Sequence, residues 1–176
     1  MHMITIVGTR HSYQMENICT PAGSEMLSYL SALCSQNQIV AIGEEISIDG
    51  LAQWESEESI PMYVAKKLNL PHCSCDPSVT DRRNLNMELN NFFIPEAELN
   101  GRTGEEIDLL IQVEYAKRER FWLEKLQAFN KWPLLFICGA NHTASFATLL
   151  KSHGIEVEIA SNDWEPANSN EINRNV

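Results

Sequence analysis

A chain of 176 residues with 44% apolar and 21% charged residues is typical of one soluble globular domain. Its 24 acidic and 13 basic side chains give a net charge of −11, which repels phosphate backbones and anionic membranes and therefore argues against a nucleic-acid groove or a membrane-surface function. No apolar stretch approaches the roughly 20 residues of a membrane span, and the N-terminus does not have the pattern of a signal peptide. Five cysteines at irregular spacing fit a reducing compartment, so we expect a cytoplasmic protein.

Apolar runs and helical patterns alternate along the chain and predict an α/β fold. In chain order we expect a strand at 3–7, a helix from Thr20 to Leu33, a strand at 39–42, a helix from Ser59 to Leu70, a weak strand at 71–75, a long helix at 103–130, a strand at 133–138, a helix at 143–153 and a strand at 155–160. Such alternation predicts three layers, with a mostly parallel sheet of about five strands and helices on both faces.

Two segments depart from this alternation. Residues 76–102 are rich in Asn and contain two prolines, so we predict a long irregular insertion that could cover the site. Residues 161–176 are polar, and we predict that they form a frayed C-terminal tail after a single domain at 1–160.

Two Gly-x-x-His tetrapeptides follow the strands predicted at the start and near the end of the chain. The first contains Gly8 and His11, and the second contains Gly139 and His142. In an open parallel sheet, ligands bind beyond the carboxyl ends of the strands. We therefore expect both histidines to face one crevice at this edge of the sheet.

Two carboxylates follow the second predicted strand at the same edge. Glu44 and Glu45 are neighbours in the chain, and neighbouring side chains beyond a strand point to opposite sides, so we expect one of them to face the crevice. Four further residues, on or directly after the weak third strand, are interpreted as structural: His72, Cys73, Cys75 and Asp76.

The chemistry open to a His–carboxylate–His set is hydrolytic in two ways. Two imidazoles and a carboxylate can bind a divalent metal such as Mn²⁺, Co²⁺ or Zn²⁺ and leave room for water, with His11, Glu44 and His142 as ligands. Alternatively, a carboxylate and an imidazole can act on water as general base and acid without a metal. Both alternatives stay open, and the candidate catalytic residues are His11, Glu44, Glu45 and His142.

Several basic and amide side chains are candidates for substrate binding. Arg118 lies on the sheet-facing stripe of the long predicted helix, roughly 18 Å before its end at about 1.5 Å per residue, which is similar to the length of a strand. Arg118 could therefore reach the crevice and either hold an anionic substrate or orient Glu44. Alternatively, its aliphatic part could pack along the edge of the apolar core and leave the guanidinium in water. The candidate substrate-binding residues are Arg82, Arg83, Arg118 and Asn141.

At these residues the chain resembles the TraB/PrgY–TIKI–erythromycin esterase–ChaN superfamily. Its members share a strand followed by Gly-x-x-His, a glutamate after the second strand, and a late strand–Gly-x-x-His followed by a helix. The similar segments here are Ile6–His11, Ile42–Glu45 and Ile137–His142. TIKI-like members are regarded as metal-dependent proteases, erythromycin esterases as metal-free hydrolases, and ChaN as a haem-binding lipoprotein. The resemblance implies that His11, His142 and one of the two glutamates form the catalytic or metal-binding set.

We therefore predict a small hydrolase that acts on a small molecule or a peptide, through a His–Glu–His site with or without a divalent metal. The alternative is a non-catalytic domain that binds or senses a small anion in the same crevice. We expect neither a nucleic acid nor a membrane as a partner.

Overall fold

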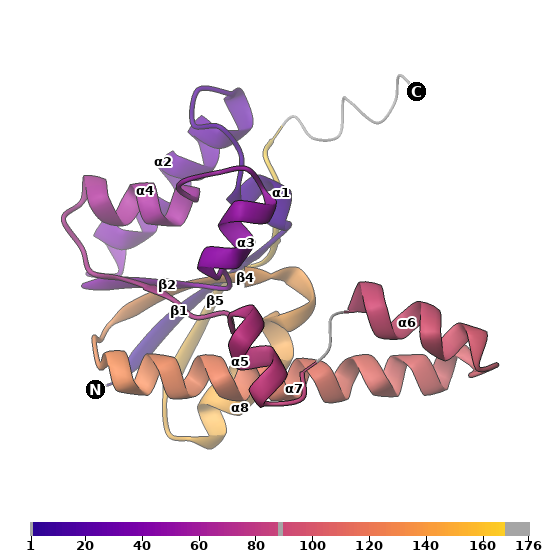
Figure 1. Ribbon diagram of the computed structural model, residues 1–176. Coiled ribbons are helices and arrows are strands. Elements are labelled where there is room, and N and C mark those ends of the chain that lie inside the picture. The colour runs from indigo at the N-terminus through magenta and orange to yellow at the C-terminus, as the bar shows by residue number, and fades with distance from the viewer. Residues whose placement is uncertain (1, 88–89, 168–176) are drawn as a thin grey trace.

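A computed structural model describes residues 2–87 and 90–167 of the protein. Within these residues, five parallel strands form one sheet in the order β3-β2-β4-β1-β5 (Figure 1). The strands are β1 (Met3–Thr9), β2 (Ala41–Glu44), β3 (His72–Ser74), β4 (Leu134–Gly139) and β5 (Glu156–Trp164). The predicted three-layer α/β fold with a parallel sheet is confirmed.

Helices cover both faces of the sheet. α2 (Pro21–Gln36) and α4 (Ile60–Lys67) lie on one face, and α7 (Gly104–Phe129) and α8 (Thr143–Ser152) lie on the other (Figure 1). The short α1 (His11–Gln14) and α3 (Ile48–Gln53) follow β1 and β2, and the 3₁₀-helix η1 (Ala140–His142) follows β4. No helix in the described part of the chain has the length and hydropathy needed to cross a bilayer.

Three helices begin at a side chain that caps their first turn. The side chains of Thr20, Ser59 and Thr103 each accept the backbone N–H three residues later, which satisfies one of the free donors of a first helical turn. At Thr103 the interaction is reciprocal, since Glu106 accepts the Thr103 backbone N–H and completes a capping box.

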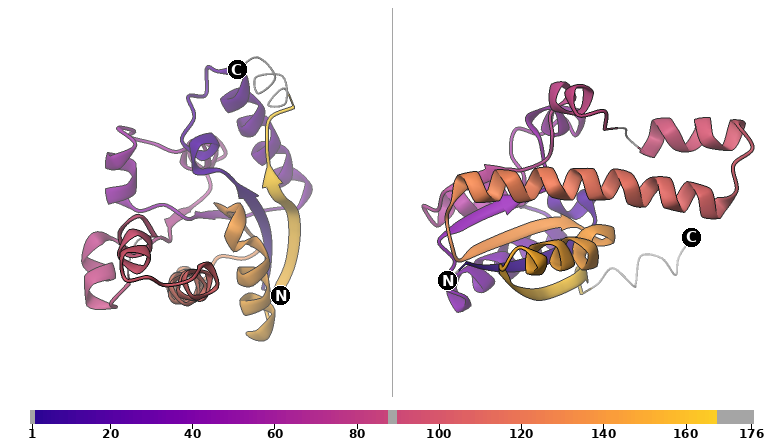
Figure 2. Two further views of the ribbon diagram at one scale, coloured as in Figure 1. Left: turned by 90° about the vertical axis from the view of Figure 1, so that its right-hand side faces the viewer. Right: turned by 90° about the horizontal axis from the view of Figure 1, so that it is seen from below.

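The segment predicted as an irregular insertion contains two helices, α5 (Val79–Asn84) and α6 (Asn90–Leu99). A second capping box, between Ser78 and Asp81, begins α5. α6 lies beside the N-terminal half of α7, and both extend beyond the sheet in Figure 1 and in the right-hand view of Figure 2. Helix formation satisfies the backbone donors and acceptors that an irregular segment of this length leaves unpaired.

The sheet separates two apolar cores. Trp122 and Leu126 of α7 pack with Phe146 of α8 against one face, and Met26 and Leu30 of α2 pack against the other; all five side chains are fully buried. Burial on both faces explains why the central strands are continuous apolar runs without alternation.

The last strand is longer than its apolar run. β5 was predicted to end at Ala160 but continues to Trp164, so the start of the predicted polar tail belongs to the sheet. Thr9 pairs with Trp164 in the register, and its hydroxyl donates to the Trp164 carbonyl at 3.0 Å. Of the rest of the predicted tail, residues 168–176 lie outside the described residues.

Gly8 allows three elements to meet at the end of β1. A Cβ placed there would lie 2.1 Å from the backbone oxygen of Asn162 in β5 and 2.3 Å from Oγ1 of Thr143 in α8. The first Gly-x-x-His motif therefore requires glycine for a steric reason, because any side chain would push β5 or α8 away from the edge where His11 begins α1.

We expect Gly8→Ala to destabilise the protein by about 1–3 kcal/mol, the usual cost of overpacking a dense interior. The measurement is the free energy of unfolding in urea. Gly104→Ala is the matched control, because a Cβ there meets nothing within 4 Å and we expect it to be neutral or slightly stabilising. Equal effects of the two substitutions would contradict the steric role of Gly8.

Candidate functional site

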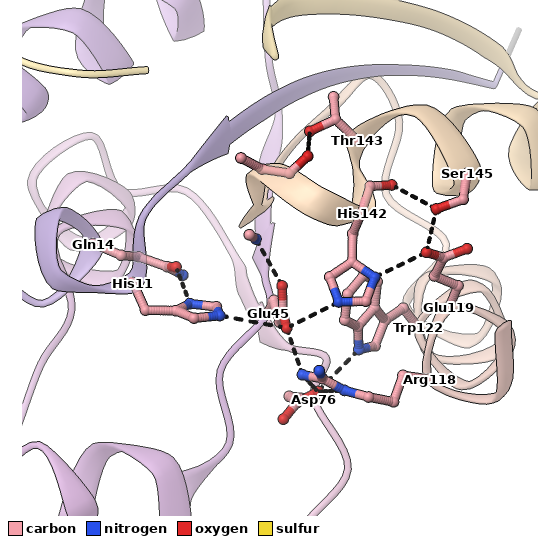
Figure 3. A network of polar contacts seen from close by, with 12 residues as sticks. His11, Gln14, Glu45, Asp76, Arg118, Glu119, Trp122, His142, Thr143 and Ser145 are labelled. Carbon is pink, nitrogen blue, oxygen red and sulfur yellow. Dashed lines mark hydrogen bonds and ion pairs between the residues drawn. The ribbon is translucent and has the colours of Figure 1, made fainter. Parts of the chain in front are cut away.

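Glu45 is the centre of a buried polar cluster at the carboxyl edge of the sheet (Figure 3). It directly follows β2, and its backbone N–H extends the pairing with β4 by donating to the Ile137 carbonyl at 2.8 Å. Its Oε2 accepts the backbone N–H of Gly139 at 2.7 Å, and its Oε1 accepts Nη2 of Arg118. Because each oxygen has its own donor, the carboxylate is held in one orientation although its side chain is 1% exposed.

Both predicted histidines face this carboxylate. Nε2 of His11 lies 3.6 Å from Glu45 Oε1, and Nε2 of His142 lies 3.7 Å from the same oxygen. His11 follows β1 and His142 follows β4, two strands that are neighbours in the sheet. A Cβ at Gly139 would lie 3.3 Å from Glu45 Oε2 and 3.4 Å from His11 Nε2, so the glycine of the second motif leaves room for the carboxylate and the ring.

The far nitrogen of each imidazole has an acceptor. Nδ1 of His142 lies 2.9 Å from Oε1 of Glu119, and Nδ1 of His11 lies 3.2 Å from Oε1 of Gln14. Both partners are oxygens, so each Nδ1 carries the proton and donates it. The neutral tautomer of each ring is thereby set, and both Nε2 atoms are left to accept or release a proton on the side of Glu45.

Glu119 is itself held by a neighbouring hydroxyl, and the His142 ring is enclosed by aromatic side chains. Ser145 Oγ donates to Glu119 Oε1 at 2.6 Å. The His142 ring lies 4.0 Å from the ring of Tyr115 and 4.8 Å from that of Trp122, measured between centroids. His142 is 3% exposed, so its ring is rigidly positioned at the floor of the site.

Arg118 connects Glu45 to a second carboxylate. Its Nε and Nη2 donate to Oδ1 of Asp76 at 3.2 and 2.8 Å, and the indole N–H of Trp122 donates to the same oxygen at 3.2 Å. Arg82 Nη2 donates to the other oxygen of Asp76 at 2.6 Å. The guanidinium of Arg118 is thus held between the buried carboxylate of Glu45 and the partly buried carboxylate of Asp76, which together compensate its charge.

These contacts shift the ionisation of the central groups. Burial raises the pKa of the Glu45 carboxyl, but the charges of Arg118, His11 and His142 outweigh it and hold that pKa well below its usual value. Burial lowers the pKa of Arg118, and the carboxylates of Glu45 and Asp76 more than reverse this effect. The interaction with Glu45 raises the pKa of His11 above 6.5 against the opposing effect of burial. An ionised Glu45 therefore favours a protonated His11.

Glu44 belongs to a separate network on the other face of the sheet. Its Oε1 accepts Ser59 Oγ at 2.5 Å and lies 2.9 Å from Nε2 of His72, and its Oε2 accepts the amide N–H of Gln14 at 2.6 Å. One of the two adjacent carboxylates therefore faces the histidines, as expected, and it is Glu45. Gln14 joins the two networks, because donation to Glu44 turns its carbonyl oxygen toward His11.

The predicted substrate-binding residues lie in different places. Arg118 reaches the carboxyl edge, but its head is buried against Glu45 and Asp76 and is not in water. Arg82 holds Asp76, whereas Arg83 is exposed on α5 outside the cluster. Asn141 lines a crevice of about 330 Å³ in front of the histidines. The residues that line this crevice are Thr9, Arg10, His11, Gly139, Ala140, Asn141, His142 and Asp163.

Two site residues were missed by sequence reasoning, although both leave a local signal. Glu119 lies on the same helix face as Tyr115 and Trp122, where a charged residue within an apolar stripe indicates a buried polar contact. Gln14 follows His11 by three residues in the short α1, which puts both on one side of the helix.

The ligand set predicted for a metal is not brought together. Glu44 faces the opposite side of the sheet from His142, and the oxygens of Glu45 are taken by Arg118 and by the backbone of Gly139. A guanidinium bonded to the central carboxylate also repels a divalent cation. Among the described residues, no group of three or more His, Cys, Asp or Glu side chains is arranged to hold a metal ion. The predicted ligands His11, Glu44 and His142 therefore do not fit a divalent metal ion.

These features define an α/β protein with a His–Glu–His centre at the carboxyl edge of a parallel sheet, in which Glu45 and His142 are buried and His11 is partly exposed. Comparison with protein-family models, with curated proteins and with solved structures finds no match for this chain. The resemblance to the TraB/PrgY–TIKI–erythromycin esterase–ChaN superfamily stays a prediction, and the functional argument depends on the geometry of the centre itself.

Glu45→Gln removes the charge that favours protonation of His11 and leaves Arg118 with one carboxylate fewer. We expect the His11 pKa to fall, and we expect the free energy of unfolding to decrease by about 3–5 kcal/mol, the usual cost of breaking a buried ion pair. An NMR titration of the His11 ring and urea unfolding measure the two effects. Glu124→Gln, at an exposed position on α7, is the control, and an unchanged His11 titration in Glu45→Gln would contradict the coupling.

Gln14→Leu tests whether Glu44 sets the tautomer of His11 through Gln14. We expect the fraction of neutral His11 that carries its proton on Nδ1 to fall, because the ring loses its acceptor. The ¹⁵N chemical shifts of the imidazole, measured above the His11 pKa, distinguish the two tautomers. Gln36→Leu on the exposed end of α2 is the control, and an unchanged tautomer ratio in Gln14→Leu would exclude this role.

Proposed function

We propose that this protein is a hydrolase in which His142 acts as general base and His11 as general acid on a small-molecule or peptide substrate. The observation that carries the proposal is the convergence of both Nε2 atoms on Glu45 Oε1, at 3.6 and 3.7 Å, with each Nδ1 held by an acceptor. Two imidazoles prepared in this way beside a crevice are suited to transferring one proton from water and another to a leaving group.

His142 is suited to the role of base by its position and its partner. Glu119 accepts its Nδ1–H, so the free Nε2 lone pair can take the proton of a water molecule that attacks the substrate. The imidazolium that forms is stabilised by two carboxylates, Glu119 at Nδ1 and Glu45 at Nε2. The Glu119–His142 pair follows the logic of a carboxylate that orients a catalytic imidazole, with water in place of a side-chain nucleophile.

His11 is suited to the role of acid by its charge and exposure. The interaction with Glu45 raises its pKa and so favours the protonated ring, and its side chain is 42% exposed and lines the crevice. It can therefore release the Nε2 proton to a leaving group as the bond to the attacked atom breaks. Glu45 stays ionised through the cycle because Arg118 and the Gly139 N–H hold its charge, and it stabilises whichever ring is protonated. Exchange with solvent through the open crevice returns both rings to their starting states.

The crevice itself suggests how a substrate is held. Asn141 is exposed at its mouth and can bind a carbonyl or amide group. Arg10 also lines the crevice and forms an ion pair with Glu165 at 2.5 Å. Arg118 does not line the crevice, and it acts as a positioning residue because it binds Glu45. A volume of about 330 Å³ suits a small molecule or the end of a chain segment.

A panel of chromogenic 4-nitrophenyl esters and 4-nitroanilides, assayed with and without EDTA and with Mn²⁺, Co²⁺ or Zn²⁺ added, tests this function. We expect turnover that EDTA does not remove and that falls by about 10²–10⁴-fold in His142→Ala, the usual contribution of a general base. His153→Ala, at an exposed position after α8, is the control. Activity that appears only with added metal would support the metal-dependent alternative, and equal rates in His142→Ala and the parent would overturn the assignment.

The pH dependence tests the acid. His11 must be protonated, so we expect turnover to fall as the pH rises through the pKa of His11, which the interaction with Glu45 raises above its usual value. His11→Ala should lose this alkaline limb together with most of its activity. A pH profile that keeps the alkaline limb in His11→Ala would exclude His11 as the acid.

Calorimetric binding of a small anion without product formation would instead favour the non-catalytic alternative.

A further inference from the structure

Two cysteine thiols lie side by side at the edge of the sheet. Cys73 belongs to β3, the edge strand, and Cys75 follows it with one residue between them. Both side chains point toward α7, and the thiol of Cys75 donates to Sγ of Cys73 at 3.5 Å. The sequence interpretation of both as core residues explains their common face but not their contact. Neither thiol takes part in the proposed hydrolytic reaction.

The two thiols differ in access and in ionisation. Cys75 is fully buried and Cys73 is partly exposed. The hydrogen bond from Cys75 lowers the pKa of Cys73 to about 7 in spite of burial, with smaller contributions from His72 and Lys125. Burial raises the pKa of Cys75 well above its usual value. A partly exposed thiolate beside a protonated thiol is the arrangement that thiol–disulfide exchange requires.

We propose that Cys73 and Cys75 form a thiol–disulfide exchange site that reacts with low-molecular-weight disulfides, with Cys73 as the attacking thiol and Cys75 as the resolving thiol. The argument rests on their 3.5 Å contact, on the access to Cys73 at an edge strand, and on the burial of Cys75 behind it. Closing the bond requires the sulfurs to approach to about 2.05 Å.

The exchange balances in two steps. The Cys73 thiolate attacks one sulfur of the disulfide, forms a mixed disulfide and releases one thiolate. That thiolate takes the proton of Cys75, whose sulfur then attacks Sγ of Cys73 and expels the second thiolate. The protein loses two electrons and the small disulfide gains them, so the products are an intramolecular disulfide, one thiol and one thiolate.

The position of the pair connects it to the His–Glu–His centre. Asp76 follows Cys75 directly and holds Arg118, Arg82 and the Trp122 indole. The backbone N–H of Cys75 donates to the Glu44 carbonyl at 2.9 Å, which anchors the segment to β2. A change in the backbone at Cys73–Cys75 therefore acts on Asp76 and, through Arg118, on Glu45.

The test uses 4,4′-dithiodipyridine with the Cys19→Ser protein, since Cys19 is exposed and would react by itself. We expect the folded protein to release two equivalents of thiopyridone and to lose two hydrogens in its intact mass, as an intramolecular disulfide requires. We also expect the Trp122 indole N–H signal to shift on oxidation. Release of no thiopyridone from the folded protein would overturn the site, and an unshifted indole signal would overturn its connection to Asp76.

Two further variants in the same background distinguish the roles of the thiols. Cys75→Ala should release one equivalent and keep a stable pyridyl adduct, and Cys73→Ser should release none on the same timescale. The rate in the parent should rise with pH through a midpoint near 7, and this midpoint should move upward in Cys75→Ala because the hydrogen bond from the thiol is lost. Equal reactivity of Cys73→Ser and the parent would assign the reaction to Cys34, Cys75 or Cys138 and contradict the role of Cys73 as the attacking thiol. All of these readouts are independent of hydrolytic activity.

Discussion

The ion pair between Glu45 and Arg118 is the interaction on which the rest of the site depends. A carboxylate that is 1% exposed would be protonated or displaced if it were left alone, because burial strongly disfavours its charge. The guanidinium, itself held by Asp76, keeps Glu45 ionised, and the Gly139 N–H keeps it oriented. The raised pKa of His11 and the placement of both Nε2 atoms follow from that fixed negative charge.

The order of the strands in the parallel sheet brings the residues around the Glu45–Arg118 ion pair together. β1, β2 and β4 lie next to one another at the centre of the sheet, so the residues that follow them emerge at one edge within a few ångströms of each other. The crossover helix α7 runs along one face of the sheet (Figure 1), and its Arg118 and Glu119 contact Glu45 and His142 at that edge (Figure 3). Elements far apart in the sequence thus provide one carboxylate, two imidazoles and the groups that orient them.

The two adjacent glutamates show how one local pattern produces two different environments. Glu44 and Glu45 point to opposite faces of the sheet, and each has its own histidine and its own donors. Gln14 joins the two sides, since its amide donates to Glu44 while its carbonyl accepts from His11. The orientation of the His11 ring, which we propose as the acid, therefore depends on Glu44 on one face of the sheet, through Gln14. Its raised pKa depends on Glu45 on the other face.

The sequence by itself determined the strands, the main helices and the common edge of the two Gly-x-x-His motifs, because these depend on local patterns of apolar residues and on the rule that parallel strands end together. It also indicated that Arg118 could reach this edge and that one glutamate would face it. Only the tertiary structure decided that the glutamate is Glu45, that Arg118 binds it, and that Glu119 and Gln14 hold the imidazoles. Those choices depend on side-chain direction and on distances between elements, which register, crossover and packing set together.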